Sequence, residues 1–329
     1  MRFGTGRGLS GPVSAARLSD VELPAIDPNR PPYPAETMLV DGRAVLVRHT
    51  QPTSSAVEPA VYVHGLGGSS TNWTDLAALL AGHVDGLALD LPGFGGSDPA
   101  RGGDYSLAAH ARVVARLIEQ RDVGPVHLAG NSLGGAVSVL VAAQRPELVK
   151  TLTLVSPAMP DLRPRRSPAV LIGAFAVPGL RQIGDRYMAR STVEARVRGV
   201  LNVCFADPSL IPEVRLAEAI AEERKMLTVP WAGAAFAGSV RGLVATYLRR
   251  GPRSLWAQAA RISAPTAVVW GEADQLVDVV LAPRTARTIP GAGLLVLPNV
   301  GHTAHLESPE PVARAMLGLL ERRPVGRRA

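Results

Sequence analysis

The chain has 329 residues, of which 47% are hydrophobic, 19% charged and 4% aromatic. This balance excludes a disordered chain and a small disulfide-stabilised scaffold, and the length allows one large domain or two ordinary ones. The 35 basic and 28 acidic residues leave a net charge of +7, which would suit a nucleic-acid partner. However, the arginines are scattered without interleaved aromatic residues, so we expect no nucleic-acid binding.

Arginines are denser in three segments, at residues 163–166, 249–253 and 322–328. We interpret these segments as solvated faces of the protein. The alternative is a peripheral contact with an anionic membrane surface.

Nothing in the chain resembles a targeting or membrane-spanning segment. The N-terminus lacks the apolar stretch of about 7 to 15 residues that a signal peptide needs. The longest apolar runs, 169–180 and 226–248, contain Pro178 and Arg241, so neither provides the roughly 20 apolar residues that cross a bilayer. The single cysteine, Cys204, cannot form an intramolecular disulfide and is expected to be a small buried residue. We therefore expect a cytoplasmic protein.

Residues 1–36 contain too many prolines for regular structure and predict an extended arm. After the arm, two strands at 37–40 and 43–48 flank Asp41-Gly42, a pair that favours a tight hairpin turn. The folded part is therefore expected to open with two antiparallel strands.

The rest of the chain alternates apolar runs with helical periodicity. The predicted strands lie at 60–63, 86–91, 126–129, 152–155, 267–270 and 294–297, and the predicted helices at 73–81, 107–120, 133–143 and 308–322. Strands without internal alternation are buried on both faces, which is typical of a parallel sheet with crossover helices. We predict an α/β fold with a mostly parallel sheet covered by helices on both faces.

This rhythm is interrupted between the strand at 152–155 and the strand at 267–270. Helical segments rich in Pro, Arg and Ala replace the strands there. We predict an α/β core made of residues 37–158 and 256–329, with a helical insert at 159–255.

The most informative segment is Gly130-Asn131-Ser132-Leu133-Gly134, between a predicted strand and a predicted helix. Glycines on both sides give a sharp strand-to-helix turn the room that it needs. Such a turn exposes the Ser132 hydroxyl and directs the backbone N–H of Leu133 toward a developing oxyanion. The alternative is an ordinary glycine-rich turn.

A serine nucleophile needs a histidine base that is itself oriented by a carboxylate. Asp274 and His302 follow the last two predicted strands, in the order Ser, Asp, His that accompanies this type of turn. His305 is an alternative base, and Glu272 and Asp278 are alternative acids, although we place Asp278 in the first turn of a helix. The other histidines occur without apparent partners and are assigned core or surface roles: His49, His83, His110 and His127.

A second oxyanion donor is expected in His64-Gly65-Leu66-Gly67-Gly68, which follows a buried strand, and we choose the N–H of Leu66. A phosphate-binding loop is the rival interpretation, but neither the Lys-Ser/Thr pair nor the dinucleotide-binding spacing is present. No Cys, His and carboxylate cluster has metal-ligand spacing, so we expect no metal and no cofactor.

Taken together, residues 37–322 resemble the α/β-hydrolase superfamily. The segment at 64–68 is similar to its oxyanion loop, 90–98 to the loop after the next strand, 130–134 to its nucleophile elbow, and 270–274, 301–302 and 307–310 to its acid and base segments. The resemblance implies a Ser132, Asp274, His302 triad, an oxyanion hole made by Leu66 and Leu133, and an insert that serves as a cap.

The serine at the elbow disfavours dehalogenases and epoxide hydrolases, whose elbow carries an aspartate. The insert is rich in apolar residues, which favours a hydrophobic substrate. We therefore predict a carboxylic ester hydrolase that acts on a small hydrophobic ester through an acyl-enzyme. A carbon–carbon bond hydrolase of ring-fission products is the enzymatic alternative, and a catalytically silent ligand-binding protein is the alternative from another class.

Overall fold

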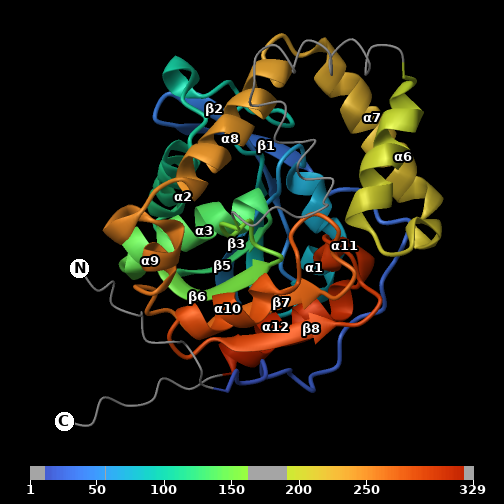
Figure 1. The fold of residues 1–329 in the computed structure, drawn as a ribbon. Coiled ribbons are helices and arrows are strands. Elements are labelled where there is room, and N and C mark those ends of the chain that lie inside the picture. Colours follow the sequence, from blue (N-terminus) through green and yellow to red (C-terminus); the bar gives the residue numbers. More distant parts are fainter. Residues whose placement is uncertain (1–11, 56, 162–190, 322–329) are drawn as a thin grey trace.

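The computed structural model describes residues 12–55, 57–161 and 191–321, and an eight-stranded sheet lies at its centre (Figure 1). The strand order is β1-β2-β4-β3-β5-β6-β7-β8. β2 runs antiparallel to both of its neighbours, and every other pair is parallel. The strands are β1 (Ala35–Val40), β2 (Arg43–His49), β3 (Glu58–Val63), β4 (Val84–Leu89), β5 (Val126–Asn131), β6 (Val149–Val155), β7 (Thr266–Gly271) and β8 (Gly293–Leu297).

Helices cover both faces of this sheet. Buried residues of α1 and α12 pack against one face, and buried residues of α2, α3, α9 and α10 pack against the other. The helices around the sheet are α1 (Thr74–Leu80), α2 (Leu107–Arg121), α3 (Leu133–Gln144), α9 (Leu255–Ala259), α10 (Leu281–Thr288), α11 (Ala304–Glu307) and α12 (Pro309–Leu320). Short 3-10 turns lie at Ser70–Trp73, Arg101–Gly103, Pro146–Leu148, Pro208–Leu210 and Gly251–Arg253. The predicted α/β architecture is confirmed.

The central strands are rich in apolar residues because both of their faces are buried. In β3, Val61 and Val63 belong to one hydrophobic cluster, whereas Ala60 and Tyr62 belong to the cluster on the other side. Alternate side chains of a strand point to opposite faces, so a strand between two helical layers has apolar residues on both faces.

The described part of the N-terminal arm packs along the outer edge of the sheet. Ala15 forms a parallel bridge with Leu294 of β8, and the two segments exchange backbone hydrogen bonds of 2.9 Å. Farther along, the Ser19 N–H donates to the carbonyl oxygen of Arg314 in α12 (3.0 Å). The arm therefore covers unpaired backbone groups of an edge strand.

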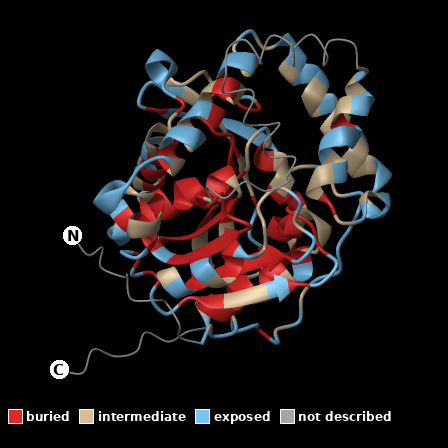
Figure 2. Cartoon of the chain, viewed as in Figure 1, coloured by how far each residue is buried: buried red, intermediate tan, exposed pale blue. Residues whose placement is uncertain are grey.

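Four helices are described between β6 and β7 in the chain: α9, which packs against the sheet, and α6 (Val193–Cys204), α7 (Glu213–Thr228) and α8 (Ala232–Tyr247), which we call the inserted helices. α8 packs closely on the segment that leads into α2: a Cβ on Gly242 would lie 2.7 Å from the Tyr105 carbonyl oxygen. In contrast, α7 contains no buried residue and α6 contains only Val197, as Figure 2 shows by their exposed and half-buried surfaces. Part of the predicted insert, with its apolar residues at 170–175 and Met188, lies outside the described residues, as do the arginines at 163–166 and 322–328.

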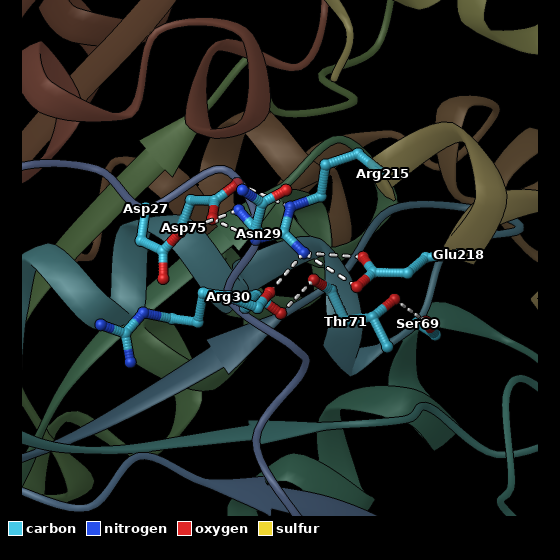
Figure 3. A network of polar contacts seen from close by, with 9 residues as sticks. Asp27, Asn29, Arg30, Ser69, Thr71, Asp75, Arg215 and Glu218 are labelled. Carbon is cyan, nitrogen blue, oxygen red and sulfur yellow. Dashed lines mark hydrogen bonds and ion pairs between the residues drawn. The ribbon is translucent and has the colours of Figure 1, made fainter. Parts of the chain in front are cut away.

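A partly buried ion pair links α7 to the sheet-bound part of the protein. The Arg215 guanidinium lies between the carboxylates of Asp75 in α1 and Glu218 in α7, beside Arg30 of the arm (Figure 3). Its Nε donates to Asp75 at 3.0 Å, and one terminal nitrogen donates to the Arg30 carbonyl oxygen at 2.8 Å. Both side chains of the pair are only 12% exposed. Arg215 thus connects the arm, α1 and α7.

Three histidines that we expected to be unpartnered have partners. His127 contacts Thr151 and Glu58, His49 pairs with Asp85, and His110 contacts Ser239 of α8. Each of these partners lies at least 24 residues away in the chain, where local sequence patterns carry no information.

Two smaller expectations also need correction. Asp278 precedes α10 and is not in its first turn; it accepts a hydrogen bond from the Val280 N–H. Cys204 ends α6 and is only partly buried as a residue, although burial raises the pKa of its thiol to about 12. Among the helices that the structure describes, none is long and apolar enough to span a membrane.

Candidate active site

Ser132 occupies a strained turn between β5 and α3. Its φ of +52° and ψ of −115° lie in a region that non-glycine residues rarely adopt. The surroundings hold this conformation: the Ser132 N–H donates to the Val155 carbonyl oxygen, and the Ser132 carbonyl oxygen accepts from Ala136 and Ala158. The predicted sharp turn is therefore present, with Ser132 directly before the N-terminus of α3.

Glycines on both sides of Ser132 allow the backbone elements to approach closely. A Cβ on Gly134 would lie 2.2 Å from the carbonyl oxygen of Val63, and a Cβ on Gly130 would lie 2.5 Å from that of Gly134. A Cβ on Gly65 would lie 3.3 Å from the Cβ of Ser132. The segment that contains Leu66 thus lies directly against the serine.

The predicted acid and base contact each other. His302 Nδ1 lies 2.8 Å from Asp274 Oδ2, and the side chains are 4% and 0% exposed. The second oxygen of Asp274 accepts the N–H groups of Leu276 and Val277, both at 2.9 Å. Since a carboxylate can only accept, His302 donates through Nδ1, and in the neutral ring Nε2 is the atom that can accept a proton.

His305 has a different environment from His302. It is 1% exposed, and its ring lies 4.4 Å from the ring of Trp73, centroid to centroid. Burial, with a smaller contribution from His302, lowers the pKa of His305 to about 3. Of the two candidate bases, only His302 is paired with a carboxylate in the described part of the chain.

The side chain that precedes Ser132 links the serine turn to the histidine loop. The amide nitrogen of Asn131 donates to the carbonyl oxygens of Val155 (3.1 Å) and His302 (3.2 Å). Across the residues of the two loops, the Ser132 hydroxyl and the His302 ring form no direct hydrogen bond. Contacts of this kind often tighten only in a substrate complex, so the arrangement remains compatible with a base acting on Ser132.

His64 fixes the segment that carries Leu66. Its Nε2 accepts from the Leu91 N–H at 2.9 Å, so the proton lies on Nδ1, which donates to the Gly65 carbonyl oxygen at 2.7 Å. Burial lowers the pKa of His64, which keeps the ring neutral and this pattern intact. The N–H of Leu133 is the first of α3 and has no acceptor within that helix.

Sequence reasoning overlooked three residues around the site. Asn131 had no assigned role in the serine turn. His64 was considered only as part of its loop, and Glu307 was considered only as part of the base segment. The Glu307 carboxylate accepts backbone N–H groups from two segments, at Gly301 (2.6 Å) and Ala206 (3.0 Å). A short spacing to His302 was the only local signal for Glu307.

A cavity of about 520 Å³ lies near the end of α8, between Tyr247 and Trp256. It does not include Ser132, Asp274 or His302 among its lining residues. Within residues 12–55, 57–161 and 191–321, no three His, Cys, Asp or Glu side chains are grouped so that they could hold a metal ion.

In a comparison with protein families, the sequence model of the alpha/beta hydrolase fold family matches residues 59–309, which is most of the chain. The chain belongs to this family. The relatives include the dihydrolipoyllysine-residue acetyltransferase component of the acetoin cleaving system of Pseudomonas putida, which is 32% identical over 80% of this chain and 64% of that protein. The chain therefore spans slightly less than two thirds of that relative's length.

Other members of the family resemble the chain over most of its length. The 2-hydroxy-6-oxononadienedioate/2-hydroxy-6-oxononatrienedioate hydrolase of Cupriavidus pinatubonensis is 25% identical, over 85% of this chain and 92% of that enzyme. Among solved structures, a putative lipase from Acinetobacter baumannii superposes with a TM-score of 0.70 at 25% identity, over 87% of this chain and 90% of the lipase. These relatives identify the chain as an α/β hydrolase enzyme.

Proposed function

We propose that this α/β hydrolase is a serine hydrolase of small hydrophobic carboxylic esters. The observation that carries the proposal is the buried contact between His302 and Asp274. The Asn131 side chain joins the loop of His302 to the strained turn at Ser132. A serine, a histidine and a carboxylate with these environments can generate a nucleophile at neutral pH.

In the acylation step, Ser132 Oγ attacks the ester carbonyl carbon while its proton passes to His302 Nε2. The N–H groups of Leu66 and Leu133 donate to the oxyanion that forms on the carbonyl oxygen. The bond between the carbonyl carbon and the alcohol oxygen then breaks, and the alcohol takes the proton from His302.

In the second step, water attacks the acyl-serine and gives its proton to His302. The bond from the acyl carbon to Ser132 Oγ breaks, the serine recovers its proton, and the carboxylic acid is released. Throughout, Asp274 accepts from Nδ1, so that it orients the ring and stabilises the imidazolium.

The inserted helices would act as a cap that provides apolar contacts to the substrate. Phe236 of α8 supports this role, because its ring lies 3.5 Å from the position of a Cβ on Gly67, next to the proposed oxyanion loop. Phe236 also packs against the main hydrophobic cluster. An apolar side chain at this place favours an acyl or hydrocarbon group over a sugar.

Labelling with a fluorophosphonate probe tests the proposal. The folded protein should be labelled, and Ser132→Ala should not be. Ser138→Ala is the matched control, since Ser138 is a buried serine of α3 that donates to the Gly134 carbonyl oxygen. Unlabelled wild-type protein, or equal labelling of Ser132→Ala, would favour the catalytically silent ligand-binding protein.

A carbon–carbon bond hydrolase is the second candidate, favoured by the similarity to the hydrolase of Cupriavidus pinatubonensis. Both activities would use Ser132 and His302, so a comparison of substrates must separate them. We expect turnover of p-nitrophenyl esters to depend on acyl-chain length and to exceed turnover of a dienone ring-fission product. Faster cleavage of the dienone would reverse this order.

A further inference from the structure

His302 is held through its backbone as well as its ring. Its N–H donates to the carbonyl oxygen of Cys204 at 2.7 Å, and its carbonyl oxygen accepts from the Asn131 amide at 3.2 Å. The ring adds the contact to Asp274 at 2.8 Å. Three segments far apart in the chain therefore determine where Nε2 of His302 lies.

One of these segments is the end of an inserted helix. Cys204 is the last residue of α6, and its carbonyl oxygen also accepts from the Thr303 N–H at 3.3 Å. A Cβ on Gly301 would lie only 2.4 Å from this oxygen. The end of α6 thus rests against the residues on both sides of His302, and glycine is required for this approach.

The Glu307 carboxylate joins the same two segments. Its Oε2 accepts from the Gly301 N–H at 2.6 Å, one residue before His302. Its Oε1 accepts from the N–H groups of Ala206 (3.0 Å) and Asp207 (3.2 Å), just after α6. Hydrogen bonds to an ionised carboxylate are about twice as strong as those between neutral groups.

The helices α6 and α7 make few apolar contacts that could replace such a link, although Phe205, directly after α6, is buried. α6 buries only Val197 among its residues, and α7 buries none. Burial of apolar side chains is the usual means by which helices are held on a protein body. At this junction, the hydrogen bonds of Glu307 add to the burial of Phe205.

We propose that Glu307 is a positioning residue that fastens the end of α6 to the loop of His302. By holding Gly301 and Ala206 together, Glu307 keeps the Cys204 carbonyl oxygen in place to accept the His302 N–H. The inference rests on the proposed function, since it takes His302 as the base. It adds that the inserted helices help to orient the base, in addition to contacting the substrate.

Glu307→Gln is the informative substitution. Both carboxylate oxygens accept N–H groups, so a glutamine can satisfy one side only and turns an NH₂ donor toward the other. Glu310→Gln is the matched control, because Glu310 lies three residues away, is exposed, and pairs with Arg314.

We expect Glu307→Gln to lower kcat for a short p-nitrophenyl ester about 10²-fold, with KM changed less than about threefold, because the reacting groups are displaced while the acyl contacts persist. In the proton spectrum, the downfield resonance of the His302 Nδ1 proton should shift or broaden. Glu310→Gln should leave both readouts at their wild-type values. A folded Glu307→Gln protein with wild-type kcat and an unchanged resonance would overturn the proposal.

Amide hydrogen exchange on the wild-type protein provides a test that needs no variant. The N–H groups of Ala206, Asp207 and Gly301 should open together, with protection factors equal within about threefold. Free exchange at Ala206 and Asp207 with strong protection at Gly301 would overturn the proposal even if the variants do not fold. The exchange and the resonance require no turnover, so they test Glu307 even if fluorophosphonate labelling refutes the serine mechanism.

Discussion

The buried, neutral state of His305 predicts a specific dependence of stability on pH. Its pKa falls from an ordinary value of 6.5 to about 3, because burial against Trp73 disfavours the charged ring. Between these two values the unfolded chain binds the extra proton and the folded protein does not. The free energy of unfolding therefore rises with pH in this window, and the contribution of His305 is lost as the pH falls below 6.5 toward 3.

The expected magnitude follows from these two pKa values. At pH 5.0 the unfolded state has nearly one more proton on His305 than the folded state, which lowers the free energy of unfolding by about 2 kcal/mol relative to pH 7.5. The local slope at pH 5.0 is about 1 kcal/mol per pH unit.

Urea denaturation of wild type and of His305→Phe, at pH 7.5 and pH 5.0, measures this contribution. Phenylalanine keeps an aromatic ring against Trp73 but does not titrate. Other ionisable groups, including His110 with its pKa of about 4, occur in both proteins and cancel in the comparison. The variant should lose about 2 kcal/mol less than wild type on acidification. An equal loss in the two proteins would show that His305 does not remain neutral in the fold.

Three further predictions concern the base, the link to α7 and the elbow. His302→Ala should lower kcat for a short p-nitrophenyl ester by about 10⁴-fold or more, because the triad acts as a unit; wild-type kcat would exclude it as the base. Arg215→Met leaves the Asp75 carboxylate without its cation and should lower the free energy of unfolding by about 3 kcal/mol in urea titrations. Its control is Arg198→Met, in an exposed pair, which should leave the urea midpoint unchanged. Gly134→Ala places a Cβ 2.2 Å from a backbone oxygen and should cost roughly 3 kcal/mol or more with loss of probe labelling. Its control is Gly199→Ala in α6, where the added Cβ would meet no atom within 4 Å and should stabilise the protein by about 0.5 to 1 kcal/mol. Equal stability of these two glycine variants would contradict the packing argument.

The sheet was predictable because burial on both faces leaves a local pattern. Apolar runs such as 126–129 match strands like β5, and the pair Asp41-Gly42 lies at the hairpin turn, with positive φ at both residues. Several strand boundaries differ from the predicted ones by one to three residues, in either direction. β5, for example, extends through Gly130 to Asn131, next to the serine.

The polar links between distant segments could not be predicted. Arg215 and Asp75 are 140 residues apart, and Glu307 and Ala206 are 101 residues apart. Charged residues on an amphipathic helix are usually solvated, so the sequence of α7 gave no reason to single out Arg215. Such pairs depend on how the inserted helices lie against the sheet, which is a property of tertiary packing.

The backbone explains why the loops of the site could be predicted and the polar links between distant segments could not. At the carboxyl edge of the sheet, a Cβ on Gly134 would meet Val63, a Cβ on Gly271 would lie 2.0 Å from the Gly301 carbonyl oxygen, and a Cβ on Gly301 would meet Cys204. These close approaches bring the loops of the site together, and each requires a glycine that the sequence displays. The glycines singled out Ser132, and the place after the last predicted strand singled out His302. Nothing comparable marked Glu307, because its contacts depend on which N–H groups the assembled loops leave beside it.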